Sequence, residues 1–298
     1  YLKGNKMYSI KIEYFEQSGG EVMILGWESE NFSKELIPHT HLFTNKGESG
    51  LEGRYFSNKD LNASTEFPTF SRIDKRINWV TGGGWGNNES QYYTERPKNV
   101  RIENGNLVIE AHKETQEGSN YTSARIKTRN SWKYGKFEIK AKLPAGRGTW
   151  SALWALPTDW VYGNWPLSGE IDIMEHVGYD EDVVVTSIHN AALSGAEIGG
   201  TDQHGYIKQP NACEQFNKYI LEWNEEEIKI IVNDKVSLHY PKQGKGWEKW
   251  PFDKRFHLIF NIAIGGNWGG AKGIDDNIFP TRMEIDYIKV FSKDELEK

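Results

Sequence analysis

Apolar and polar side chains alternate along many short runs of this chain, and turn-forming residues separate the runs. Alternation is typical of a β-strand with one buried face, because successive side chains of a strand point to opposite sides. Helical periodicity is nearly absent, and Asn233-Asp234 predicts a hairpin turn. The pattern predicts an all-β fold, an antiparallel β-sandwich of two sheets. The runs that predict strands from residue 107 onward are 107–111, 124–128, 135–141, 149–156, 183–189, 217–223, 227–232, 256–264 and 283–290.

The N-terminal part of the chain is organised differently. Two alternating runs, 7–15 and 21–27, flank a Ser-Gly-Gly turn and predict a hairpin. Residues 28–50 are polar and irregular, and their Gly-rich end predicts a linker. We therefore expect three parts: residues 1–49 as a fragment with a linker, residues 50–77 as an atypical segment, and residues 78–298 as the main domain.

Composition limits the classes of function. Aromatic residues make up 13% of the 298 residues, including 12 Trp, against only 37% hydrophobic residues, and this mixture suits short strands and surfaces on which sugar rings stack. The net charge of −6 argues against a nucleic-acid partner. The single cysteine, Cys213, excludes an internal disulfide. Apolar runs are far shorter than the roughly 20 residues that span a bilayer, so we expect no membrane span.

The stretch 168–176 carries three carboxylates in a run that is otherwise typical of a buried strand. Glu170 and Asp172 share one face of such a strand, whereas a regular strand would send Glu175 to the other face. One extra residue, a β-bulge at about Met174, would return Glu175 to the face of the other two acids. Bulges are over-represented beside active sites, so this stretch is a candidate catalytic strand.

Three acids on one face cannot all ionise cheaply, so at least one of them is expected to hold a proton. A protonated acid beside an ionised one is the arrangement that glycoside cleavage needs, and a separation of about 5 Å favours the retaining route. The alternative is an acidic face that is merely solvated. The flanking Ile, Met and Trp residues disfavour that alternative.

Residues from about 78 to 292 resemble the family-16 glycoside hydrolases, in particular the bacterial laminarinases. This resemblance implies an endo-β-1,3-glucanase with a β-jelly-roll, concanavalin A-like sandwich and a concave substrate cleft. The five-residue step from Glu170 to Glu175, with Met174 inserted, is similar to laminarinases, whereas lichenases lack that position. The blocks that carry the resemblance are 84–89, 91–94, 121–126, 134–138, 143–146 with Trp150 and Trp154, 168–176, 188–189 and 261–268.

The resemblance also implies the roles of the acids. Glu170 is expected to be the nucleophile that attacks the anomeric carbon. Glu175 is expected to be the general acid and then the general base. Asp172 is expected to orient Glu170 and to tune the proton between the pair. His189 is expected to support these carboxylates, and the alternative is a packed histidine with one satisfied nitrogen.

Other residues are expected to bind the substrate. Trp150, Trp154 and Trp268 are expected to stack on glucose rings, although the face that carries Trp150 and Trp154 could instead be interior. The resemblance implies that Asn88 and Arg125 contact sugar hydroxyls on the non-reducing side of the scissile bond. For Asn88 the alternative is a turn residue, and for Arg125 it is an ion pair with a neighbouring glutamate, Glu89 or Glu138.

The sequence departs from the family before residue 78. Residues 1–44 resemble the end, and residues 50–79 the beginning, of a protective-antigen-type carbohydrate-binding module. The family's usual opening strand is not recognisable, and Leu51–Phe56 is a hypothetical substitute for it. The family implies a possible structural calcium ion with Asp286 as one ligand, but one carboxylate does not establish a site of six or more ligands.

We therefore expect an endo-acting retaining hydrolase of β-1,3-glucan such as laminarin, and also of mixed-linked β-1,3-1,4-glucan. One alternative is a non-catalytic glucan-binding protein on the same sandwich. Another is a family relative that acts on agar or carrageenan. We expect the enzyme to require no cofactor and to act as a monomer. Its substrate suggests an extracellular location, although no signal peptide is visible in this sequence.

Overall fold

The computed structural model describes residues 26–29, 32–36, 51–55, 70–74, 82–83, 86–194, 203–244 and 246–291. The chain divides into two compact units, Tyr1–Trp79 and Val80–Lys298, and each is described by itself. The predicted strand 7–15 lies outside the described residues. Among the described residues, no helix combines the length and the apolar character that a membrane crossing requires.

The first unit contains two short antiparallel pairs. Strand β1 (Gly26–Ser29) pairs with β2 (Phe32–Leu36), so the prediction that residues 28–50 are irregular is wrong for 32–36. Strand β3 (Leu51–Tyr55) pairs with β4 (Phe70–Asp74). The hypothesis that Leu51–Phe56 replaces the opening strand of the sandwich is therefore wrong, because alternation predicts a strand but does not name its partner.

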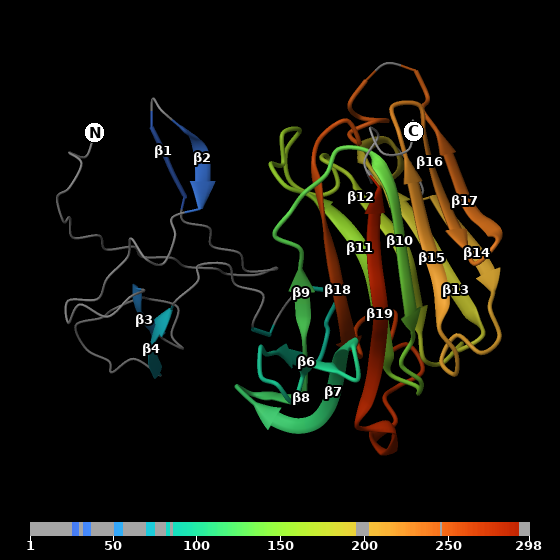
Figure 1. Cartoon of the computed structure of the whole chain (residues 1–298). Coiled ribbons are helices and arrows are strands. Elements are labelled where there is room, and N and C mark those ends of the chain that lie inside the picture. Colours follow the sequence, from blue (N-terminus) through green and yellow to red (C-terminus); the bar gives the residue numbers. More distant parts are fainter. Residues whose placement is uncertain are drawn as a thin grey trace. The chain divides into compact units, whose positions relative to one another are not determined.

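The second unit is built on a nine-stranded and a six-stranded sheet (Figure 1). In the nine-stranded sheet all pairs are antiparallel except the short parallel pair of β5 and β8. The strands of this sheet, in spatial order, are β17 (Lys235–Pro241), β16 (Glu227–Val232), β15 (Asn217–Trp223), β10 (Gly135–Lys142), β19 (Thr281–Phe291), β7 (Asn106–Gln116), β8 (Ser119–Ser123) and β5 (Gln91–Tyr93), and β6 (Val100–Glu103) pairs with β7.

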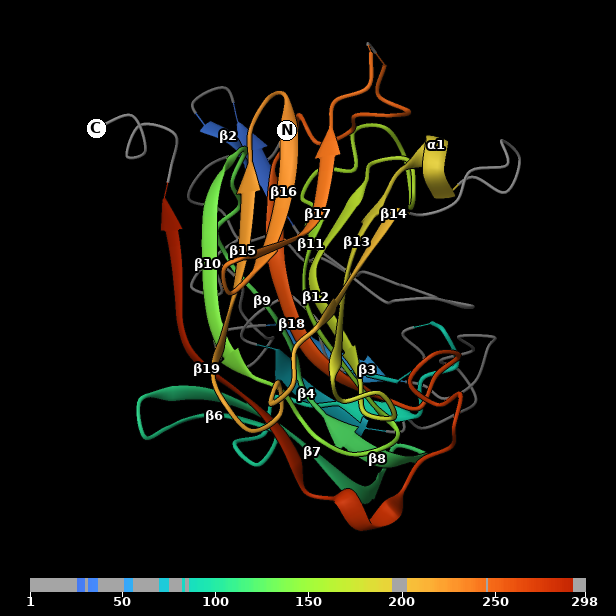
Figure 2. The same ribbon diagram turned by 90° about the vertical axis from the view of Figure 1, so that its right-hand side faces the viewer.

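The six-stranded sheet is entirely antiparallel. Figure 2 shows its central strands β11, β12 and β13 beside β10, β15 and β16 of the other sheet. A helix α1 (Ala191–Ser194) follows β13, and a 3-10 helix (Asp276–Ile278) precedes β19. The strands of this sheet, in spatial order, are β14 (Gln203–Lys208), β13 (Val183–His189), β12 (Glu170–Val177), β11 (Thr149–Pro157), β18 (Phe256–Ile264) and β9 (Arg125–Lys127).

The hydrophobic core lies between the two sheets. Alternate residues of β10, such as Phe137 and Ile139, pack with alternate residues of β11 and β18, such as Leu153 and Phe260. Burying one face of each sheet against the other stabilises both, because apolar burial is the main favourable term in folding. The predicted all-β antiparallel sandwich is confirmed, and the hairpin turn at Asn233 joins β16 to β17 as predicted.

Five strands of the second unit were not predicted: β5, β6, β8, β14 and β17. Four of these, β5, β6, β14 and β17, lie at sheet edges. An edge strand is bonded on one side only and exposes more of its side chains, so its sequence needs fewer apolar residues. Strand β14, with the sequence QHGYIK, shows this composition.

Candidate active site

The face of the six-stranded sheet that is turned away from the core carries the predicted catalytic residues, and we call it the site face. On β12, Ile171 and Ile173 are fully buried in the core. Glu170 and Asp172 alternate with them and therefore lie on the site face. On the neighbouring strand β11 the same alternation buries Leu153 in the core and places its neighbours on the site face.

A β-bulge in β12 returns Glu175 to the site face. Asp172 lies opposite Ser187 of β13, and Glu175 lies opposite Val185. Strand β12 therefore advances by three residues where β13 advances by two. Met174 and Asp172 lie opposite two consecutive residues of β11. Strand β12 therefore advances by two residues where β11 advances by one. The extra residue is accommodated at 173–174, and Met174 is fully buried in the core. The predicted bulge at about Met174 is confirmed.

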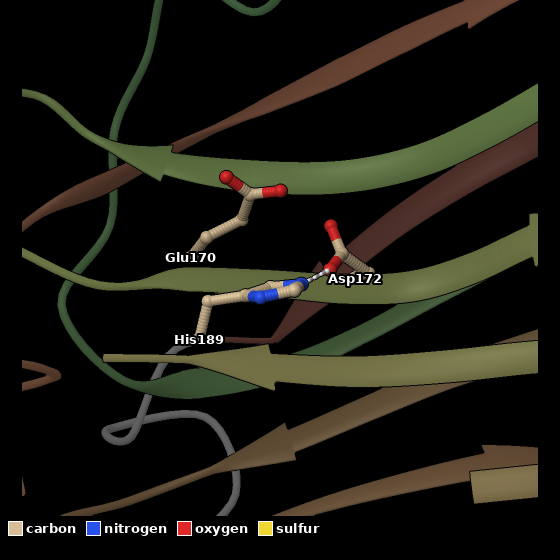
Figure 3. Close-up of side chains that lie close together, drawn as sticks. All are labelled: Glu170, Asp172 and His189. Carbon is tan, nitrogen blue, oxygen red and sulfur yellow. Dashed lines mark ion pairs between the residues drawn. The ribbon is translucent and has the colours of Figure 1, made fainter. Parts of the chain in front are cut away.

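Glu170, Asp172 and His189 converge on the site face (Figure 3). One polar atom of each lies within 4.8 Å of the others. His189 is opposite Glu170 in the β12–β13 pairing, and its Nε2 lies 2.9 Å from Asp172 Oδ2. The imidazole thereby fixes the Asp172 carboxylate beside Glu170. The structure places His189 against the acids, where the sequence predicted a supporting residue.

Glu175 is held by two side-chain donors. Trp150 Nε1 donates to Glu175 Oε1 at 3.1 Å, and Ser187 Oγ donates to Glu175 Oε2 at 3.3 Å. Burial and then the negative charge of Asp172 raise the pKa of Glu175 to about 8, and these two hydrogen bonds oppose the rise. A carboxyl group in this state keeps its proton at neutral pH, as a general acid must.

Burial is also the largest influence on Glu170. Burial and the charge of Asp172 raise the pKa of Glu170 well above its usual value of 4.5, while His189 acts in the opposite direction. Glu170 and Glu175, whose pKa values are each raised by burial and by the charge of Asp172, therefore titrate as interacting groups. In such a set, one ionised and one protonated carboxyl group can coexist near neutral pH.

Two of the three predicted tryptophans lie on β11 on the site face, and the alternative of an interior face does not apply to them. Trp150 donates to Glu175 and forms an edge-to-face ring pair with Trp268, with centroids 5.5 Å apart. Trp154 lies opposite Asp172 in the strand pairing. The Arg125 guanidinium lies over the Trp154 ring, with its Cζ 4.7 Å from the ring centroid. All three rings remain partly exposed and available for contact.

Arg125 lies on β9 opposite Asn261 of β18, at the same end of the site face as Trp154. Burial lowers the pKa of Arg125, and the charges of Tyr93, Glu89 and Glu170 act in the opposite direction. The charge of Glu89 therefore acts on Arg125, and the ion pair of the alternative interpretation stays a prediction. Glu138, the other proposed partner, lies on β10 of the other sheet and accepts from Tyr287.

Asn88 is an exposed turn residue. Its backbone has a positive φ of 56°, a conformation that asparagine tolerates better than most residues. Its amide donates to Asn267 Oδ1 at 2.7 Å, next to Trp268. The turn interpretation therefore holds for Asn88. Its expected contact with sugar stays a prediction.

Sequence reasoning missed a chain of polar groups on the site face. Trp154 Nε1 donates to Asn261 Oδ1 at 2.8 Å, and Asn261 Nδ2 donates to the Tyr93 hydroxyl at 3.1 Å. That hydroxyl in turn approaches Glu89 Oε2 at 3.4 Å, and Gln91 donates to the same oxygen at 2.7 Å. The alternation of β18 was a usable signal for Asn261, because its neighbours in sequence face the core.

Asp286 was the one residue proposed to bind calcium. Its carboxylate lies on β19 and pairs with Lys140 Nζ at 2.8 Å. A lysine ammonium at this distance already neutralises the carboxylate, and the expected calcium ion stays a prediction.

Comparisons with known proteins agree with this geometry. The family model for glycosyl hydrolases family 16 matches residues 87–289. A beta-glucanase from Rhodothermus marinus is 48% identical over 222 residues, which cover 71% of this chain and 77% of that protein. A glucan endo-1,3-beta-glucosidase from Cryptopygus antarcticus is 35% identical over 232 residues, covering 72% of this chain and 85% of that protein.

The solved structures include the X-ray structure of the laminarinase from Rhodothermus marinus. It is 48% identical, covers 72% of this chain and 88% of its own chain, and has a TM-score of 0.68. Residues 87–289, which the family model matches, contain the bulged acidic strand and all but the last two residues of the two sheets. The chain therefore belongs to glycosyl hydrolases family 16.

Proposed function

We propose that this protein is an endo-acting β-glucanase that cleaves β-1,3-glucan, and also mixed-linked β-1,3-1,4-glucan, with retention of configuration. The observation that carries the proposal is the bulged strand β12, which gathers Glu170, Asp172 and Glu175 on one face. The relatives named as a beta-glucanase, a laminarinase and a glucan endo-1,3-beta-glucosidase support the choice of substrate.

The first step of the proposed reaction forms a bond between Glu170 and the anomeric carbon. Glu175 transfers its proton to the glycosidic oxygen as the bond to the leaving sugar breaks. Asp172, fixed by His189, holds Glu170 in position and favours proton retention on Glu175 through its negative charge. The product of this step is a glycosyl ester on Glu170 with Glu175 ionised.

The second step hydrolyses that ester. Glu175, now a base, takes a proton from water, and the oxygen of that water attacks the anomeric carbon. Glu170 leaves as a carboxylate, and Glu175 is again protonated. Two displacements at one carbon give net retention. Trp150, Trp154 and Trp268 supply partly exposed rings on which glucose units stack.

The test is product analysis on laminarin, lichenan and agarose in parallel. We expect laminarin to yield a range of oligosaccharides, as internal cleavage requires, lichenan to be cleaved as well, and agarose to stay intact. In the variant Glu170→Ala we expect turnover to be abolished while oligosaccharide binding stays measurable. Cleavage of agarose without cleavage of laminarin or lichenan would show that β-glucan is not the substrate. Near-normal hydrolysis by the Glu170→Ala variant would rule out Glu170 as nucleophile.

The non-catalytic alternative is tested by the same experiment, because a glucan-binding protein would release no reducing sugar. We also propose that the enzyme acts outside the cell, where polymeric glucan occurs, and that it acts as a monomer. The support for the location is the size of the substrate. The support for the monomer is that every catalytic group named above comes from one chain.

A further inference from the structure

Ser187 links the acid Glu175 to a histidine that the reaction described above does not use. Its hydroxyl oxygen lies 3.3 Å from Glu175 Oε2 and 2.8 Å from His204 Nδ1. The strand pairing produces this link, because Ser187 of β13 lies opposite Asp172 on one side and opposite His204 of β14 on the other. Three neighbouring strands thus contribute one group each to a continuous hydrogen-bonded line.

Burial differs along this line. Ser187 is fully buried, with no exposed surface, whereas His204 is exposed. The line therefore runs from a half-buried carboxyl group through a fully buried hydroxyl to an exposed imidazole. A buried hydroxyl hydrogen is costly to leave without an acceptor, so the direction in which Ser187 donates depends on its two partners.

The other groups around His204 are few among the described residues. The ring of His189 on β13 lies 6.1 Å from the ring of His204, and Tyr206 on the same strand also lies at 6.1 Å. Beyond His189 is the Asp172 carboxylate. Strand β17 packs beside β14 and carries His239, whose Nε2 pairs with Glu227 at 2.8 Å.

The single hydrogen of the Ser187 hydroxyl can serve only one acceptor at a time. When Glu175 is ionised, its carboxylate accepts that hydrogen. When Glu175 is protonated, its own hydrogen can be donated to Ser187 Oγ, and the hydroxyl hydrogen then needs a different acceptor. Unprotonated His204 Nδ1, at 2.8 Å, is in place to accept it.

We propose that Ser187 and His204 form a positioning pair for Glu175, in which the Ser187 hydroxyl turns between His204 when Glu175 is an acid and Glu175 when it is a base. This proposal rests on the assignment of Glu175 as the acid and base of the reaction. No bond of Ser187 breaks, because only the direction of its hydrogen changes. His204 acts through Ser187 and does not touch the substrate in this role.

The two residues affect the pKa of Glu175 in opposite directions. Ser187 lowers it by donating to the carboxylate. The variant Ser187→Ala should therefore raise it, and the basic limb of the pH profile of kcat/KM should move to higher pH. Unprotonated His204 competes for the same hydrogen and so favours the protonated acid. The variant His204→Ala should move the basic limb to lower pH. One hydrogen bond corresponds to a shift of about 0.5–1 pH unit.

The experiment measures kcat/KM on laminarin oligosaccharides against pH for the wild type, the two single variants and the double variant. We expect shifts of opposite sign in the single variants. The double variant should match Ser187→Ala, because His204 acts only through the hydroxyl. The variant His204→Asn, whose amide oxygen replaces Nδ1 as an acceptor, should restore the wild-type basic limb. The matched control is His239→Asn, which removes an exposed histidine from β17 and should leave the profile unchanged.

A substrate-independent measurement separates this proposal from the proposed function. Carbon-13 NMR titration of labelled glutamate carboxyl groups follows Glu175 directly, with Glu175→Gln to assign its signal. If the wild type fails to cleave laminarin, the proposed function fails while this titration still tests the link. Shifts of the same sign in both single variants, or a double variant that differs from Ser187→Ala, would overturn the proposal.

Discussion

Glu170 and Glu175 are chemically identical side chains on one strand, and their neighbours give them different expected roles. Glu175 is held by the indole of Trp150 and the hydroxyl of Ser187, and its pKa is raised to about 8. Glu170 lies beside Asp172, whose carboxylate is fixed by His189. Divergent surroundings of two carboxyl groups are the physical basis on which one becomes the acid and the other the nucleophile.

The variant Glu175→Gln tests the acid at the residue scale. We expect kcat on laminarin to fall roughly 10²–10⁴-fold, because general acid catalysis contributes that much. Formation of the glycosyl ester from an aryl β-glucoside oligomer with an activated leaving group should be much less affected, since that group leaves without a proton. Burst kinetics on the aryl substrate measure this step. Equal losses on both substrates would contradict the role of Glu175 as acid.

The same variant should change stability with pH. Folding raises the pKa of Glu175 from 4.5 to about 8, so the folded protein resists an ionisation that the unfolded chain permits. The wild type therefore loses stability from this group as pH rises from about 4.5 to 8, and Glu175→Gln does not. Urea unfolding at pH 5 and at pH 8 measures this effect. From pH 5 to pH 8, the free energy of unfolding of the variant should rise relative to that of the wild type by on the order of 1–3 kcal/mol. An unchanged difference would mean that Glu175 ionises freely in the folded protein.

At the scale of the element, a bulge in β12 accommodates one extra residue and keeps Glu175 on the site face. Without the extra residue between Asp172 and Glu175, simple alternation would place both acids on the site face, as on a regular strand. With one extra residue, the bulge at 173–174 restores that face and buries Met174 in the core. With the bulge or without it, the residues of β12 after Glu175 face the same residues of β11 and β13.

Deletion of Met174 is the corresponding test. We expect the deletion variant to fold with a regular β12, to keep Glu175 on the site face, and to retain measurable hydrolysis of laminarin. Its free energy of unfolding should fall by roughly 2–5 kcal/mol, because a buried methionine side chain is lost from the core. Denaturant unfolding and a reducing-sugar assay measure the two effects.

The matched control for this deletion is Met174→Leu, which conserves volume and should cost less than about 1.5 kcal/mol with near-normal activity. A deletion variant that folds but has no activity would show that the face alone does not suffice. In that case the local curvature of the bulge would be what places Glu175 against the glycosidic oxygen.

At the scale of the whole molecule, every residue of the candidate site belongs to the unit Val80–Lys298. Both sheets of the sandwich and the core between them also belong to that unit. The strands described in the first unit pair only with each other: β1 with β2, and β3 with β4. The described residues thus assign the chemistry to one unit.

A chain that begins at Val80 should therefore keep its activity. We expect its kcat and KM on laminaritetraose to lie within about twofold of those of the full chain, because no described side chain of the site is removed. Sedimentation with insoluble glucan, compared between the two chains, tests whether residues 1–79 bind sugar as their resemblance to a carbohydrate-binding module implies. Loss of tetrasaccharide hydrolysis would show that residues 1–79 supply part of the site.

The sequence predicted most of the central strands, because their core faces are strongly apolar and alternate strictly. It also predicted the acidic face of β12, since alternation and one extra residue are local properties that need no knowledge of neighbouring strands. Edge strands such as β14 were missed because their exposure allows polar side chains. For the same reason, nothing in its sequence indicated that β14 brings His204 to Ser187.

Pairing between strands was decided by the tertiary structure alone. Leu51–Tyr55 alternates as a strand of the sandwich would, yet its hydrogen bonds go to β4. Ser187 meets Glu175 and His204 only because β12, β13 and β14 pair in one particular register. The sequence by itself determined which residues share a face of a strand. The packing of the two sheets determined which faces meet and how deeply the acids are buried, and burial is the largest influence on their pKa values.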